Sequence, residues 1–536
     1  MRATGVRHMA GNPYGRLRGK WRAVLERRRH RRSGEYTPRL WPIAVPAVFW
    51  LTVACVLGVW SYRYMLGRPF HVLPWPVASP RVNPDRALKN TAGVAGLVGV
   101  VLTGVYAYRK QKLAEGESRR ADAQEFSRRY GEALTQLGDE QPAVSLGGAY
   151  AMARLADDWE DQRQTCIDVL CAYLRMACDP DDETTPHGEK EVRITVQRLI
   201  QAHVTPHPGP RRPSWSPHDF DLTEAHLHNA DFTDATFTGN AEFGGARFSG
   251  EARFCGATFS NLAGFGGALF SEPADFGRTK FSEPTDFSGV RFSGPARFGG
   301  ARFSGDAGFG GTNFSEAAGF GDAVFSGTAG FGDATFSGTA GFGGATFSGP
   351  AEFGRVVFSG PAEFGRATFS GPAGFGRTTF SGPAEFGRTM FSGPAEFGRA
   401  TFSGFAGFGR TTFSDSAGFV GTTFSGLAGF DGGRFSGDAG FGEARFSGDA
   451  GFGGATFSGL VWFVGASFSR AARFDGAIFR NDPVVKGMTL EKAPELDGVS
   501  FLEWPEPNRA CKEDSPQKNR GQDKTGNAVE EGDEPG

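Results

Sequence analysis

The chain has 536 residues, a formal net charge of −2, and 22% charged residues. A balance this close to neutral argues against a strongly basic nucleic-acid-binding protein and against a strongly acidic rod. The 80 glycines do not indicate collagen, because they follow no period of three.

Residues 1–40 carry twelve lysines and arginines, and residues 41–60 form an uncharged apolar stretch flanked by Trp41 and Trp60. About 20 apolar residues suffice to span a bilayer, and tryptophan is enriched at its interfaces. We therefore predict a transmembrane helix over 41–60. A secretory signal peptide is the less favoured alternative, because the basic region is too long and no small-residue cleavage site follows.

A second apolar stretch, residues 91–108, predicts a second transmembrane helix. The intervening loop, 61–90, contains five lysines and arginines, whereas seven follow directly after the second stretch. The positive-inside rule then places both ends in the cytoplasm and the loop outside, in a multi-pass protein of the inner (plasma) membrane. The alternative for residues 91–108 is an interfacial or buried helix.

Residues 109–205 are expected to form a helical cytoplasmic module. Apolar residues at helical spacing predict helices over 121–137, 144–157 and 165–176. The last two resemble a HEAT-like pair, with inward-facing side chains at Leu146, Tyr150, Ala153 and Leu155 on one helix and Ile167, Leu170, Tyr173 and Leu174 on the other. The six cysteines show neither C-x-x-C nor zinc-type spacing, and Cys166 and Cys171 are expected to be buried thiols in a reducing compartment.

A proline-rich linker over 206–217 leads to a repeat region over 218–481. From Phe232 to Phe479 a phenylalanine returns after alternating steps of five and six residues, and 46 of the 52 phenylalanines follow this pattern. Glycine and proline in nearly every unit exclude a helix. Steps of five and six also exclude a flat strand, because successive rings would face opposite sides. The chain must therefore turn a corner between rings.

The start of this region, Asp221-Leu222-Thr223-Glu224-Ala225 and the two five-residue units after it, resembles the pentapeptide-repeat family. The string Leu146-Gly147-Gly148-Ala149-Tyr150 likewise resembles the segment before the repeats in many bacterial membrane-anchored members. The resemblance implies a mainly β fold, a right-handed quadrilateral β-helix. The extra residue in every second segment predicts a coil of about 22 residues with two widened corners, where Pro350, Asp438 and Thr328 would lie. Leu222 and Leu227 are expected to cap the first coil.

After Phe479 the rhythm stops. Residues 482–504 are expected to form a C-terminal cap, with 484–488 and 499–504 as the closing strand segments. Residues 505–536 are expected to be disordered because they are polar and charged. A rival interpretation makes the whole phenylalanine-glycine region a disordered assembly tract. The unbroken register and the small residue two positions before nearly every phenylalanine favour order, because a disordered tract needs neither.

No nucleophile–base pair, phosphate loop or metal signature is evident, and the carboxylates near residue 160 are expected to form a solvated helix end. We therefore expect no enzyme activity, no cofactor and no metal. The candidate interaction residues are an arginine ladder with an eleven-residue period and four glutamates, each three residues before an arginine: Arg355, Arg366, Arg377, Arg388, Arg399 and Arg410, with Glu352, Glu363, Glu385 and Glu396. In the structural interpretation, these arginines and glutamates neutralise one another and keep the surface soluble. In the functional interpretation, they form a mixed-charge docking face.

These features predict a membrane-anchored, non-catalytic scaffold that binds an unknown protein partner, with the bilayer contacted through 41–60 and 91–108. The first alternative is a DNA mimic that protects gyrase. Such a mimic needs a strongly acidic rod, whereas residues 221–480 contain 24 acidic and 18 basic residues. Nucleic acid is not expected as a partner, because the region also lacks a basic stripe. The second alternative is the disordered assembly tract.

Overall fold

The computed structural model describes residues 84–176, 187–206 and 213–499, together with Thr52, Val53, Cys55, Val56, Val59 and Trp60. The chain divides into two compact units, Met1–Gln162 and Arg163–Gly536. The boundary falls inside the segment 109–205, for which the sequence predicted one helical module.

Within the described residues 84–162, the first unit contains α3 (Pro84–Leu137), α4 (Pro142–Asp158) and the short 3₁₀ helix η1 (Glu160–Gln162). Helix α3 is 54 residues long and extends far beyond the helix predicted over 121–137. Gly148 of α4 lies against the end of α3, where a Cβ would come 2.7 Å from the backbone carbon of Gln136. The helices can therefore approach closely at this point. Tyr150, predicted to face inward, is instead 56% exposed.

The membrane predictions fall largely outside what the structure describes. Residues 91–108 are helical and belong to α3. Among the described residues, no helix is long and apolar enough to cross a membrane. Apart from six positions, the predicted span 41–60 lies outside the described residues, as do 1–40 and 505–536. Both spans stay predictions.

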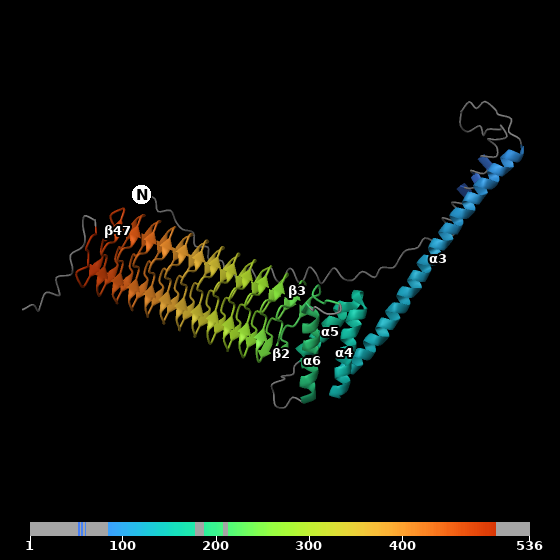
Figure 1. Ribbon diagram of the computed structural model, residues 1–536, viewed down its shortest axis with the longest axis horizontal. Helices are drawn as coiled ribbons and strands as arrows, with labels where there is room; N and C mark the ends of the chain where they lie inside the picture. The colour runs from blue at the N-terminus through green and yellow to red at the C-terminus, as the bar shows by residue number, and fades with distance from the viewer. Residues whose placement is uncertain are drawn as a thin grey trace, which may run out of the picture. The chain divides into compact units, whose positions relative to one another are not determined.

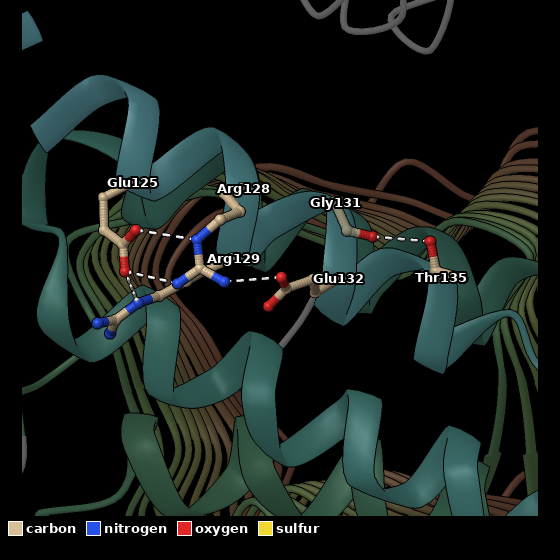
Figure 2. A network of polar contacts seen from close by, with 6 residues as sticks. All are labelled: Glu125, Arg128, Arg129, Gly131, Glu132 and Thr135. Carbon is tan, nitrogen blue, oxygen red and sulfur yellow. Dashed lines mark hydrogen bonds and ion pairs between the residues drawn. The ribbon is translucent and has the colours of Figure 1, made fainter. Parts of the chain in front are cut away.

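The exposed side of α3 near its C-terminal end carries a network of charged side chains (Figure 2). Arg128 bonds to Glu125 at 2.8 Å and to Glu132 at 2.7 Å, and Arg129 bonds to Glu125 at 2.6 Å. The hydrogen bond from Arg128 lowers the pKa of Glu125 to about 2. Ion pairs between residues three and four positions apart stabilise an exposed helix. Here they stabilise the segment of α3 that packs against α4.

The second unit is a β-helix preceded by α5 (Arg163–Arg175) and α6 (His187–Val204), shown in Figure 1 as a stack of strands from β2 to β47. One coil has four short strands, for example β24 (Ala351–Glu352), β25 (Val357–Phe358), β26 (Ala362–Glu363) and β27 (Thr368–Phe369). From β3 (Thr236–Phe237) onward, each strand pairs in parallel with the strand 22 residues away, as Phe369 does with Phe391. The first two strands pair across 21 residues, as Phe220 does with Ala241. The predicted four-sided coil of 22 residues is confirmed.

The strands form four parallel sheets, which we name A to D in their order around the coil. Sheet A has 12 strands from β1 (Phe220–Asp221) to β44 (Val461–Trp462), sheet B has 13 from β2 (His226–His228) to β48 (Thr489–Leu490), sheet C has 11 from β6 (Ala252–Arg253) to β46 (Ala472–Arg473), and sheet D has 12 from β3 (Thr236–Phe237) to β47 (Ile478–Phe479). About twelve coils are therefore stacked. This ordered architecture rules out the disordered-tract interpretation for residues 213–499.

The core is a continuous stack of phenylalanine rings. Phe364 is fully buried, and its centroid lies 4.8 Å from those of Phe342 and Phe386 in the adjacent coils, with the rings nearly parallel. It also meets Phe353 and Phe375 edge to face at 5.4 Å. Offset-stacked and edge-to-face arrangements are the favourable geometries for aromatic pairs. Each ring therefore contacts rings in its own coil and in both neighbouring coils.

The two kinds of corner explain the alternating steps of five and six. At the narrow corners, between sheets A and B and between C and D, the chain makes a β-turn whose third residue has positive φ, as at Arg355 (φ 61°). At the wide corners, between B and C and between D and A, an extra residue is accommodated. There a Cβ at Gly382 would lie 2.6 Å from the carbonyl oxygen of Gly360 in the previous coil. The wide corners need glycine because neighbouring coils approach closely.

Helices α5 and α6 cover the first coil. The side-chain amide of Gln197 donates to the carbonyl oxygen of His228 at 2.9 Å and accepts its N–H at 3.0 Å. Gln164 pairs with the backbone of Asp219 in the same way, at 2.8 and 3.0 Å. These glutamines satisfy backbone groups that would otherwise form an open sheet edge. Leu222 and Leu227, predicted to cap the first coil, are both fully buried.

Two more residues of the second unit support this cover. Arg193 is 2% exposed and donates to the carbonyl oxygens of Tyr173 and Leu174 at the end of α5. Trp215, in the predicted linker 206–217, is fully buried and its ring stacks on that of His203 at 4.0 Å. Part of that segment is therefore packed structure.

The C-terminal rungs continue the coil with smaller side chains. Val484 pairs with Trp462 and Glu495 with Arg473 as isolated parallel bridges, and β48 pairs with the strand that contains Phe468. The closing strand predicted over 484–488 is thus a single bridge at Val484, and the last described strand follows at 489–490. The second predicted segment, 499–504, lies outside the described residues except for Val499. The period of 22 persists although the phenylalanines have stopped.

Candidate interaction surface

The six arginines of the ladder occupy the positive-φ positions of the narrow corners, with φ between 56° and 62°. Arg355, Arg377 and Arg399 lie at the A–B corner, and Arg366, Arg388 and Arg410 lie at the C–D corner, diagonally opposite. All six are exposed. Other coils place glycine at this position, for example Gly300 and Gly432. A non-glycine residue in the left-handed region costs roughly 1–2 kcal/mol, so six consecutive arginines are not what backbone conformation alone favours.

One arginine shows what this position can reach. The guanidinium of Arg355 donates from Nε and Nη2 to the two carboxylate oxygens of Asp333, each at 2.6 Å. Asp333 occupies the same corner position in the preceding coil. The hydrogen bond from Arg355 lowers the pKa of Asp333. An arginine at a narrow corner can therefore hold a carboxylate located about one coil away.

The four glutamates do not neutralise the ladder by direct contact. Glu352 and Glu396 face outward on sheet A, and Glu363 and Glu385 face outward on sheet C. Across the described parts of the chain, none of these four forms an ion pair within 4.0 Å. Among the described residues, the structural interpretation of a mutually neutralising ladder therefore has no ion pair of these glutamates to support it.

A groove runs along the C–D corner beside the second arginine column. Its volume is about 400 Å³, and its lining consists of glycines with two arginines and one aspartate: Asp322, Gly343, Gly344, Gly365, Arg366, Gly387 and Arg388. Because most of these residues have no side chain, the backbone itself forms much of the floor. Two guanidinium groups, those of Arg366 and Arg388, lie along the groove.

A separate acidic site, which the sequence analysis missed, lies at the start of sheet A. Asp221 is directly opposite Glu242 on the paired strands β1 and β4, so their side chains lie in adjacent coils. Glu242 Oε1 is buried without a hydrogen-bond partner among the described residues. Burial first, and then the charges of Asp221, Asp286 and Asp219, raise the pKa of Glu242 to about 7. The strict five-residue spacing around Asp221 could have predicted this site from the sequence, because it places Asp221 one coil before Glu242.

Glu242 should make the first coils less stable as the pH rises. A raised pKa means that the folded state holds the proton more tightly than the unfolded state. The destabilisation of the folded state by ionised Glu242 is therefore absent below the ordinary pKa of 4.5. It grows as the pH rises to about 7 and stays constant above that pH. Glu242→Gln should raise the local opening free energy by about 1–3 kcal/mol at pH 8 and change it little at pH 4. Hydrogen exchange of amides 220–243 measures this, and an equal effect at both pH values would contradict it.

Other reactive groups are few in the described part of the chain. Cys166 and Cys171 are buried as expected, and burial raises the pKa of the Cys166 thiol to about 12. Among the residues searched, no group of three or more His, Cys, Asp or Glu is placed to hold a metal ion.

Comparison with known proteins identifies the repeat region. The family model described as pentapeptide repeats (9 copies) matches residues 222–269, 265–312, 309–357, 353–401 and 430–478. These matches lie within the β-helix and leave the preceding helices unassigned. No curated protein and no solved structure gives a significant match to the chain. The resemblance predicted from residues 221–235 is therefore confirmed for the repeats.

Proposed function

We propose that this chain, whose repeat region is a pentapeptide-repeat β-helix, is a non-catalytic scaffold that holds a protein partner on its rigid surface. The observation that carries this function is the unbroken ring stack. Because each ring, such as Phe364, is fixed by rings on both sides, the coils should bend little relative to one another. Side chains on the outer face then recur every 4.8 Å in straight columns. A surface of this kind presents repeated groups at fixed spacing.

We further propose that the scaffold is attached to the membrane by residues 41–60 and 91–108, with both ends in the cytoplasm. The support is the distribution of lysine and arginine around the two apolar stretches. The DNA-mimic alternative has less support, because the central coils from 351 to 410 carry four glutamates and six arginines.

The test compares the intact chain with a broken rod. Phe364→Asp/Phe386→Asp should disrupt the central coils, whereas Phe405→Asp changes an exposed corner residue and serves as the matched control. We expect a specific protein partner to co-purify from membranes with the intact chain and the control and to be lost from the broken rod. The intact chain should also remain in the membrane after alkaline carbonate extraction.

Two outcomes would contradict these proposals separately. Equal capture by all three proteins would move the binding function away from the central rod. Complete release of the protein by carbonate would contradict the proposed membrane attachment but not the scaffold function. Gyrase as the captured partner would favour the DNA-mimic alternative.

A further inference from the structure

The narrow corners contain a backbone N–H group that the coil-to-coil hydrogen bonds do not use. It belongs to the residue directly before the positive-φ position. In five places a carboxylate of the chain itself accepts this N–H: Asp221 from Thr223, Asp231 from Thr233, Asp275 from Gly277, Asp286 from Ser288, and Asp431 from Gly453, at 2.8–3.2 Å. The amide of a narrow corner can therefore bind a carboxylate.

The arginine-bearing coils at the C–D corner leave the same group unoccupied. The equivalent amides are those of Gly365, Gly387 and Gly409, and no acceptor within the described residues pairs with them. At four of the five occupied corners the accepting aspartate lies two residues before the amide. The corresponding residues here are Glu363, Glu385 and Gly407. A glutamate is one methylene longer than an aspartate, and neither of the two glutamates turns back onto its own corner.

A guanidinium group follows each of these amides directly. Arg366, Arg388 and Arg410 come one residue after the three glycines, and none of them forms an ion pair within the described residues. The contact between Arg355 and Asp333 shows that an arginine at such a corner forms a bidentate bond to a carboxylate. Two such pairs, Gly365 with Arg366 and Gly387 with Arg388, line the groove. Gly409 and Arg410 repeat the arrangement in the next coil, and adjacent coils are 4.8 Å apart. Charge-assisted bonds of this kind are the stronger class of hydrogen bond.

We propose that the C–D groove binds the carboxylates of an extended acidic peptide from the partner protein. The inference rests on the proposed scaffold function and names the chemistry of its partner. A peptide is favoured over nucleic acid because residues 221–480 contain 24 acidic and 18 basic residues and lack the basic stripe that nucleic acid needs. Glu363, Glu385 and Asp322 oppose an anion, so the peptide should lie toward sheet D, where Thr368 and Met390 face outward.

The test uses the full-length chain and a fluorescent peptide of eight glutamates, with a peptide of eight glutamines as the neutral probe. Arg366→Gln/Arg388→Gln/Arg410→Gln should weaken binding of the acidic peptide at least about tenfold, measured by fluorescence anisotropy. The matched control removes three outward arginines from sheet B, Arg247→Gln/Arg291→Gln/Arg445→Gln, and should change binding less than about twofold. Glu363→Gln/Glu385→Gln should instead strengthen it about threefold. Thermal melting of each variant checks that it remains folded.

Three results would overturn the inference. Equal losses from the corner and sheet B variants would mean non-specific attraction to positive charge. Tighter binding of an eight-nucleotide single strand than of the peptide would favour nucleic acid. Binding seen only after removal of residues 505–536 would assign the groove to the chain's own acidic segment, which includes Glu530, Glu531, Asp533 and Glu534.

The outcome is separable from that of the scaffold test. A partner captured by the intact rod, together with no affinity for the acidic peptide, would reject only the groove. Loss of peptide affinity on replacing the three corner arginines, with no partner captured, would leave the groove as a binding site and reject the scaffold role in the cells used.

Discussion

Phe364→Asp should unfold the coils on either side of residue 364. The ring is fully buried and has aromatic neighbours in its own coil and in both adjacent coils. Truncation of a buried phenylalanine costs about 3–5 kcal/mol, and an unpaired carboxylate in the same place costs several more. We expect local opening free energies between residues 340 and 390 to fall by about 5 kcal/mol or more, with new proteolytic cleavage in that segment.

Phe405 provides the control for this substitution. It is the same residue type in the same part of the β-helix, but it lies at a wide corner and is 40% exposed. The position 44 residues later at this corner is Asp449, so an aspartate fits the local backbone. Phe405→Asp should therefore change the local opening free energies measured by hydrogen exchange by less than about 0.5 kcal/mol. Equal destabilisation by the two substitutions would mean that burial in the ring stack does not determine stability.

Gly382→Ala should strongly destabilise the β-helix although it adds a single methyl group. Its Cβ would lie 2.6 Å from the carbonyl oxygen and 2.7 Å from the carbonyl carbon of Gly360, both of which are backbone atoms of the previous coil. Backbone cannot rotate away as a flexible side chain does, so two coils must separate locally. We expect a loss of about 2–4 kcal/mol in local stability, measured by hydrogen exchange across the B–C corner.

The matched control is Gly376→Ala, at a narrow corner. A Cβ there would lie 3.7 Å from the nearest atom, the carbonyl oxygen of Gly398, which is ordinary contact, and its φ is not in the left-handed region. Because alanine also lowers the entropy of the unfolded chain, this change should be neutral or stabilising by up to about 1 kcal/mol. Comparable losses at Gly376 and Gly382 would show that close coil approach is not the reason for glycine.

The repeat fold was predictable because its signal is periodic. Each phenylalanine repeats the same local choice, and the alternation of five and six residues requires two narrow and two wide corners. The reason for glycine at the wide corners was not predictable. Serine-glycine indicates a turn in sequence, whereas the approach of Gly382 to Gly360 depends on a residue 22 positions away.

The ends of the β-helix were the least predictable part. Gln164 and Gln197 act as substitutes for a neighbouring strand, but each does so once and across 55 and 31 residues. No period marks them, and glutamine in a helix normally indicates only a polar surface. The arginine ladder was visible in sequence, whereas its conformation and the carboxylate-binding amides beside it depend on turns that sequence spacing alone does not define.

The 22-residue coil has a consequence for how such a protein can change length. The repeating unit in sequence has eleven residues, which is half a coil. Duplication of two units inserts one complete coil, lengthens the rod by about 4.8 Å, and leaves everything beyond it facing the same direction. Duplication of one unit adds half that length and turns all that follows by half a revolution, which exchanges the A–B and C–D corners. An odd or even number of added units therefore determines on which side of the rod a downstream segment emerges.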